Sequence, residues 1–161
     1  MEISRHPPMS STPNEVVVLA QQTAAALIKV VPLIMQFIRA EIRQTPCSVL
    51  SVPQFRLLAY LEQQPGTNLS KVAEYLDVTR ATASATIERL VQSGYVDRSV
   101  DPQERRYVRL HLTDHGLQEL EAMRQMIRNQ LAALLTSLPP EQLASIETSL
   151  EILYQVFQPI V

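Results

Sequence analysis

The sequence holds few of the residues from which covalent or phosphate-binding sites are built. Its 161 residues include one cysteine, Cys47, and three isolated glycines. A single cysteine excludes a disulfide within the chain and is typical of cytosolic proteins. Three separated glycines leave no glycine-rich loop that could cradle a nucleotide phosphate, and no nucleophile elbow or pair of catalytic acids is present. We therefore expect a protein that is not an enzyme and needs no cofactor.

Histidine and cysteine are too sparse to predict a metal or redox centre. His111 and His115 are four residues apart, but they lie on either side of a predicted strand-to-helix junction and have no cluster of further ligands beside them. We predict no metal site. Cys47 has no basic residue next to it to lower its thiol pKa, which disfavours a role in redox sensing.

The charge balance is slightly acidic, and the positive charge is concentrated in one segment. The net charge is −2, which argues against a protein that binds nucleic acid by bulk charge alone. Residues 66–112 carry a net charge of +1, whereas the rest of the chain carries −3. Tight binding to DNA would then require these charges to lie on one face and to be doubled by a dimer. The start of the chain lacks the apolar run of a signal peptide, so we expect a cytoplasmic location and no membrane partner.

Two alternating runs, residues 95–99 and 107–112, flank a charged turn. In the second run the apolar residues 108, 110 and 112 share one face, which is typical of a half-buried strand. The turn begins with Asp-Pro at 101 and carries Arg105 and Arg106 in adjacent positions. A two-stranded ribbon with guanidinium groups at its tip is suited to reach into a groove lined with phosphates.

The preceding segment predicts two short helices joined by a tight connection. Residues 69–76 place their apolar side chains on one side, and Thr79 is positioned to cap a second helix that runs to about Ser93. Gly94 follows as a helix-terminating glycine. Two such helices followed by a β-ribbon form a winged helix-turn-helix.

At the level of these motifs, residues 57–116 resemble the multiple-antibiotic-resistance regulator (MarR) family of bacterial transcription factors. The motifs that carry the resemblance are LSKVA at 69–73, VTRAT at 78–82, RL at 89–90, GYV at 94–96, DPQERR at 101–106 and LTDHG at 112–116. The sequence departs from the family at Ala85, where many relatives have a basic or polar residue, and at Glu104, where aspartate is more usual. The resemblance implies a mainly α fold with a small β-wing, flanked by N- and C-terminal dimerisation helices.

The helix faces and the resemblance together predict the residues that contact DNA. Thr82, Thr86 and Arg89 would meet the major groove, unless they merely form a solvated helix face. Ser70, Lys71 and Arg80 would hold phosphates near helix N-termini. Arg106, with Arg105 beside it, would enter a minor groove, or one of the two arginines would pair within the wing. The full predicted DNA-binding set is Ser70, Lys71, Thr79, Arg80, Thr82, Ala85, Thr86, Arg89, Arg105 and Arg106, and the wing-stabilising set is Arg98, Asp101 and Glu104.

The flanking segments predict helices with apolar seams. Residues 13–43 keep helical spacing across Pro32, which indicates one long kinked helix or two helices. Residues 53–64 form the next helix, and residues 113–137 and a last helix ending near Phe157 follow the wing. We divide the chain into a leader (1–12), an N-terminal dimerisation helix (13–52), a winged domain (53–112) and C-terminal dimerisation helices (113–161). The alternative to a homodimer is a closed monomeric helical bundle.

These observations predict a homodimeric transcriptional regulator that reads a pseudo-palindromic operator in double-stranded DNA. The resemblance implies a repressor released by a small, often aromatic or phenolic, effector. Apolar residues that could line an effector cleft, or could simply pack in the core, are Ile34, Met35, Ile38, Phe55 and Leu58. The alternative function is a winged-helix protein-interaction module that has lost DNA binding, which the low basic charge and Ala85 favour.

Overall fold

The computed structural model describes residues 13–44, 50–100 and 108–158. The chain divides into two units, Met1–Ala40 and Glu41–Val161. Cys47 and the turn of the wing, with Asp101, Glu104, Arg105 and Arg106, lie outside the described residues.

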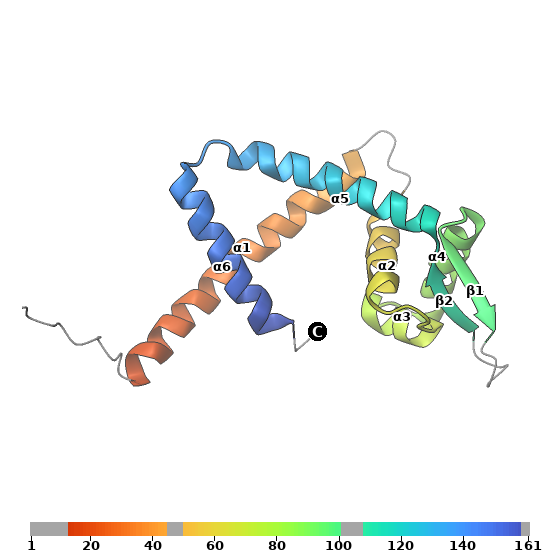
Figure 1. The fold of residues 1–161 in the computed structure, drawn as a ribbon. Helices are drawn as coiled ribbons and strands as arrows, with labels where there is room; N and C mark the ends of the chain where they lie inside the picture. Colours follow the sequence, from red (N-terminus) through yellow and green to blue (C-terminus); the bar gives the residue numbers. More distant parts are fainter. Residues whose placement is uncertain (1–12, 45–49, 101–107, 159–161) are drawn as a thin grey trace, which may run out of the picture. The chain divides into compact units, whose positions relative to one another are not determined.

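The described elements, in order, are α1 (Pro13–Gln44), α2 (Val52–Gln63), α3 (Leu69–Leu76), α4 (Arg80–Gln92), β1 (Val96–Val100), β2 (Val108–Leu112), α5 (Asp114–Leu135) and α6 (Pro140–Phe157) (Figure 1). The predicted fold class, mainly α with a two-stranded wing, is confirmed.

Helix α1 continues through Pro32, so the prediction of one long helix is confirmed. Of its residues, all of which the structure describes, Ile42 alone is buried. Val16, Ile28 and Leu33 are each more than half exposed. By length and composition α1 is also apolar enough to cross a membrane, a test that the core helices of soluble proteins and N-terminal signal sequences pass as well. Its apolar surface thus requires a partner that the first unit by itself does not supply.

The helices of the winged unit begin at side-chain caps that the sequence contains. Asn68 accepts a hydrogen bond from the Lys71 amide at the start of α3 (3.1 Å). Thr79 accepts one from the Thr82 amide at the start of α4 (3.2 Å), as its position predicts. At the far end of α4, Gly94 adopts a φ of +72°, a left-handed conformation that glycine allows at little cost.

The wing is an antiparallel pair in which only the base is buried. Val96 pairs with Leu112 and Arg98 with Leu110, so Val96 and Leu110 both belong to the core. Val100 and Val108 form the last described pair and are exposed, although the alternating pattern places Val108 on the same face as Leu110. A short bridge adds to this base: the Leu110 amide donates to the Thr67 carbonyl at 2.9 Å. The sequence did not indicate that the α2–α3 connection would join the wing.

The core of the winged unit is closed within one chain. Its wholly buried side chains come from the segment before α2 and from α2, α3, α4, β1 and α5: Leu50, Leu57, Leu58, Leu61, Val72, Leu90, Val96 and Leu120. Leu58, which was considered as a cleft residue, is one of them and therefore packs as core. Burial of eight such side chains contributes about 1.5–3 kcal/mol for each one.

The wing is joined to α5 by a close packing contact at Gly116. The Thr113 side chain caps α5 by accepting from the Gly116 amide (2.9 Å), and its hydroxyl donates to the Gly94 carbonyl (2.7 Å). The Thr113 amide donates to the Tyr95 carbonyl (3.1 Å). A Cβ atom on Gly116 would overlap that same carbonyl oxygen and would lie 2.8 Å from Leu112 Cδ1. Glycine at this position therefore lets the first turn of α5 rest directly on the backbone that follows α4.

We predict that Gly116→Ala lowers the free energy of unfolding by about 2–3 kcal/mol, because the added methyl group meets backbone that cannot move aside. Helix propensity alone would have the opposite effect, because alanine in place of glycine within a helix raises the free energy of unfolding by about 1 kcal/mol. Urea unfolding followed by circular dichroism measures the difference, and Gln118→Ala, at an exposed position of the same helix, is the control. A Gly116→Ala variant as stable as the parent protein would show that the contact is not tight.

Candidate nucleic-acid interface

The outer face of α4 is exposed and rests on a buried stripe of the same helix. Ala83, Ile87 and Leu90 are buried and form the inner face of the helix. The exposed residues on the opposite side are Ala81, Thr82, Ala85, Arg89 and Gln92. The helix is fixed in the core by its apolar stripe, so this outer face is presented to solvent in one defined orientation.

Thr86 does not belong to this outer face, and the prediction that it meets DNA is wrong. Its side chain is 9% exposed, and its hydroxyl donates to the Thr82 carbonyl at 3.0 Å. Thr86 lies three residues after the buried Ala83, which places it on the inward side of the helix. Its hydroxyl is satisfied within the helix and cannot contact a base.

The N-termini of α3 and α4 are brought together by a side-chain contact. The Arg80 guanidinium, in the first turn of α4, donates to the hydroxyl of Ser70 in the first turn of α3. Lys71, next to Ser70, is exposed. Helix N-termini carry partial positive charge and unpaired amide groups, so this cluster of Ser70, Lys71 and Arg80 is suited to hold an anionic phosphate.

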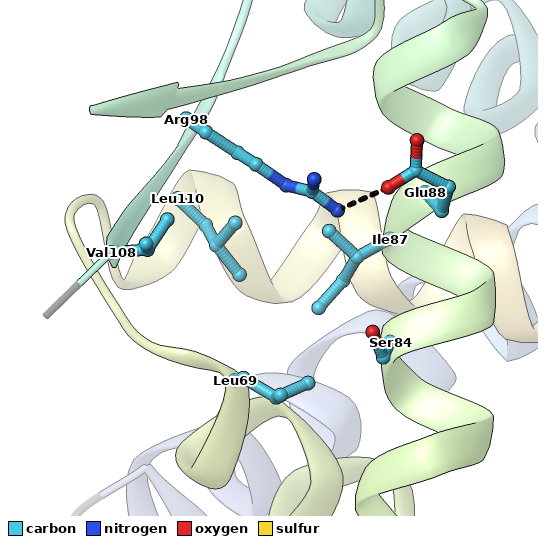
Figure 2. Close-up of a pocket in the computed structure, with 7 residues that line it drawn as sticks. All are labelled: Leu69, Ser84, Ile87, Glu88, Arg98, Val108 and Leu110. Atoms are coloured by element: carbon cyan, nitrogen blue, oxygen red, sulfur yellow. Dashed lines mark hydrogen bonds and ion pairs between the residues drawn. The ribbon is translucent and has the colours of Figure 1, made fainter. Parts of the chain in front are cut away.

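An ion pair ties the wing to α4. Arg98 Nη2 on β1 lies 2.7 Å from Glu88 Oε2 on α4, with side chains 38% and 49% exposed. Figure 2 shows this pair beside a small hollow of 240 Å³, whose apolar wall includes Ile87 and Leu110 and whose rim includes Ser84. Arg98 was expected to brace the wing, but Glu88 was not anticipated as its partner. The only sequence signal was their opposite charge on either side of the α4–β1 turn.

Three further contacts of α2, which the sequence did not indicate, hold the elements around the interface. The rings of Tyr60 and Tyr75 stack with centroids 4.2 Å apart, and Arg56 donates to the Tyr75 carbonyl at 3.2 Å, which joins α2 to α3. Arg124 on α5 forms an ion pair with Glu62 on α2 at 2.6 Å, and this hydrogen bond to Glu62 raises the pKa of Arg124. Helix α3 is thereby attached to α5 through α2.

The described parts of the chain give no support for a metal site. Over residues 13–44, 50–100 and 108–158, no group of three or more histidine, cysteine or acidic side chains is arranged to hold a metal ion. The exposed outer face of α4, the paired N-termini and the adjoining wing therefore form the candidate site.

Comparison with known proteins agrees with this geometry. The sequence profile of the MarR family matches residues 50–108, which cover α2 through the start of β2. The chain carries a MarR-family winged helix-turn-helix over residues 50–108. Its winged helix-turn-helix is that of a DNA-binding transcriptional regulator and not of an enzyme.

Individual relatives of this MarR-family chain are distant in sequence. It is 24% identical over 105 residues to the HTH-type transcriptional repressor IacR of Pseudomonas putida, a match that spans 65% of this chain and 63% of IacR. The fold is similar to that of the transcriptional regulator Tm0710 of Thermotoga maritima, with a TM-score of 0.69 at 21% identity over 84% of this chain and 96% of Tm0710. It is also similar to Streptococcus pneumoniae FabT, solved in complex with DNA, with a TM-score of 0.58 at 21% identity over 88% of this chain and 99% of FabT.

We predict that Glu88 and Arg98 are energetically coupled. Partly exposed ion pairs contribute about 0.2–1 kcal/mol, so the double-mutant cycle of Glu88→Gln and Arg98→Gln should give a coupling energy in that range. Urea unfolding of the four proteins measures it. The cycle of Arg98→Gln with Glu141→Gln, a carboxylate in the first turn of α6, is the control and should give none. Equal values in the two cycles would mean that the ion pair does not hold the wing.

Proposed function

We propose that this MarR-family protein is a homodimeric regulator that reads a pseudo-palindromic operator. The recognition helix α4 would lie in the major groove and the wing in the flanking minor groove. The observation that carries this proposal is the exposed outer face of α4, which is held on a closed core beside the paired N-termini of α3 and α4. FabT, whose fold is similar, was solved with DNA, and Staphylococcus aureus MepR was solved bound to an oligodeoxyribonucleotide.

Each part of the candidate site has a distinct role in this docking. Thr82, Ala85 and Arg89 on α4 face the base edges in the major groove. Ser70, Lys71 and Arg80 bind phosphates and so position the helix, while Thr79 keeps its structural role as the cap of α4. Arg105 and Arg106 enter the minor groove from the turn of the wing, and Asp101 and Glu104 stabilise that turn.

The apolar surfaces of the terminal helices support a homodimer. None of the residues of α6, all of which are described, is buried, and Leu150, Ile152 and Tyr154 are more than half exposed. The exposed apolar side chains of α1 require cover in the same way. A second copy of the chain supplies matching surfaces, and two-fold symmetry gives the two reading heads that a palindrome needs.

Insertion of α1 into a membrane is a weaker explanation of its apolar surface. Lys29 lies near the middle of α1, so a spanning helix would place its ammonium group near the bilayer centre. A charge there costs about 2.5–3.5 kcal/mol on insertion scales. Pairing of α1 with another helix leaves Lys29 free to reach water, and a regulator that binds DNA works in the cytoplasm.

We further propose that the protein represses transcription and that an effector releases it from the operator. The name of IacR describes a repressor, and we propose the same sign of regulation here. The candidates to contact an aromatic or phenolic effector are Ile34, Met35 and Ile38 of α1 and the half-buried Phe55 of α2. Leu58 is excluded because it is wholly buried in the winged core.

The second candidate function is a protein-interaction module without DNA binding. It is favoured by the net charge of −2 and by Ala85, which places a methyl group at the centre of the α4 outer face. A protein of that kind would bind duplex DNA no more tightly than expected from its charge.

Selection from randomised duplex DNA tests the proposal. We expect enrichment of a pseudo-palindrome whose half-sites are about one helical turn apart. Arg89→Ala should weaken binding to the selected duplex by about 1–3 kcal/mol and relax the preference at one base position per half-site. Arg106→Ala should weaken binding with little change in preference, since minor-groove arginines read mainly groove width and charge.

The matched control is Arg128→Ala, which removes an exposed arginine from α5 and should leave affinity unchanged. If no sequence is enriched, the DNA-binding proposal fails and the interaction module is favoured. If a duplex is enriched but Arg89→Ala and Arg106→Ala bind it like the parent protein, the proposed docking through α4 and the wing is wrong.

A further inference from the structure

The first two turns of α4 present methyl groups on the outer face of the helix. Ala81, Thr82 and Ala85 are exposed there. At 3.6 residues per turn, Ala81 and Ala85 lie about 40° apart around the axis, with Thr82 beside them. The charged side chains that follow in the third turn are Glu88, which is paired with Arg98, and Arg89.

The polar groups of these two turns already have partners in the structure. The Thr82 hydroxyl lies 2.9 Å from the Thr79 hydroxyl, which leaves the Thr82 methyl group as its distinctive feature on the outer face. Arg80 is bound to Ser70 at the edge of the helix. Ser84 lines the hollow beside the wing (Figure 2). The N-terminal half of the reading face is therefore short, apolar and free of long side chains.

We propose that this methyl surface reads thymine. The inference rests on the proposed function, because it assumes that α4 enters the major groove. The residues near the N-terminus of a recognition helix are those that contact base edges. In the major groove the C5-methyl group of thymine is the one apolar mark on a base edge, and alanine and threonine methyl groups are its usual contacts.

The small side chains at positions 81 and 85 also affect how closely the helix can approach DNA. Alanine at 81 and 85 allows the helix backbone to approach the groove floor closely, so a thymine methyl can pack against the helix without intervening water. Each half-site is then expected to carry T·A pairs beneath Ala81, Thr82 and Ala85. Any guanine contact comes from Arg89, one turn further along.

Replacement of thymidine by deoxyuridine in the selected duplex tests this directly, since it removes the methyl group and keeps the Watson–Crick pairing. We expect affinity to fall about four-fold for each contacted methyl, and about fifteen-fold when one methyl is lost from both half-sites. Deoxyuridine at thymidine positions outside the half-sites is the control and should leave affinity unchanged.

A protein variant identifies the residue that makes the contact. Ala85→Gly removes the methyl group from the protein side, so the effect of deoxyuridine at the position beneath residue 85 should disappear in this variant. Ala122→Gly, at an exposed position of α5, controls for the general effect of glycine in a helix and should keep the full four-fold response. The comparison uses ratios of affinity within one protein, so a change in helix stability does not enter.

Two negative results can be told apart. A selected duplex that binds tightly and is indifferent to deoxyuridine at every half-site position overturns the thymine inference but leaves the proposed regulator intact. Failure to enrich any duplex overturns the proposed function, and the thymine inference falls with it.

Discussion

The fold depends on the burial of apolar side chains away from water. This burial is extensive in the winged unit and largely absent from α1 and α6. In the winged unit, leucines of α2, α4 and α5 are wholly buried around the base of the wing. In α1 only Ile42 is buried, and all of α6, which the structure describes in full, is at least partly exposed. The winged unit therefore has its own core, whereas the terminal helices carry apolar surface that association with a second copy of the chain would cover.

The reading face depends on a few contacts that fix α4 relative to its neighbours. Thr113 and Gly116 seat α5 against the backbone after α4, and the Glu88–Arg98 ion pair connects α4 with β1. These contacts fix the direction in which the outer face of α4 points, so its orientation does not depend on a large number of charged side chains. Under the proposed function, these contacts would let a chain with a net charge of −2 present Lys71, Arg80 and Arg89 to a phosphate-lined groove.

Much of the fold was predictable because its signals are local. Thr79 as the cap of α4, Gly94 at its end and the alternation around Leu110 each act over a few residues. The features that sequence missed depend on contacts between distant segments, such as the Thr67–Leu110 bridge and the Glu88–Arg98 pair. Thr86 was misplaced because its position lies at the border between the two faces of α4, where only the packed helix decides burial. The predicted roles of Arg105 and Arg106 lie outside the described residues.

In the proposed regulator two copies of the chain act together, and each presents one α4 face to half of an operator. The most direct measurement is the molar mass of the complex on a single selected duplex, obtained by sedimentation equilibrium at micromolar protein, together with that of the free protein. The account predicts two chains per duplex and a free protein that is already a dimer. A monomeric free protein, or one chain on a duplex with two half-sites, would contradict it.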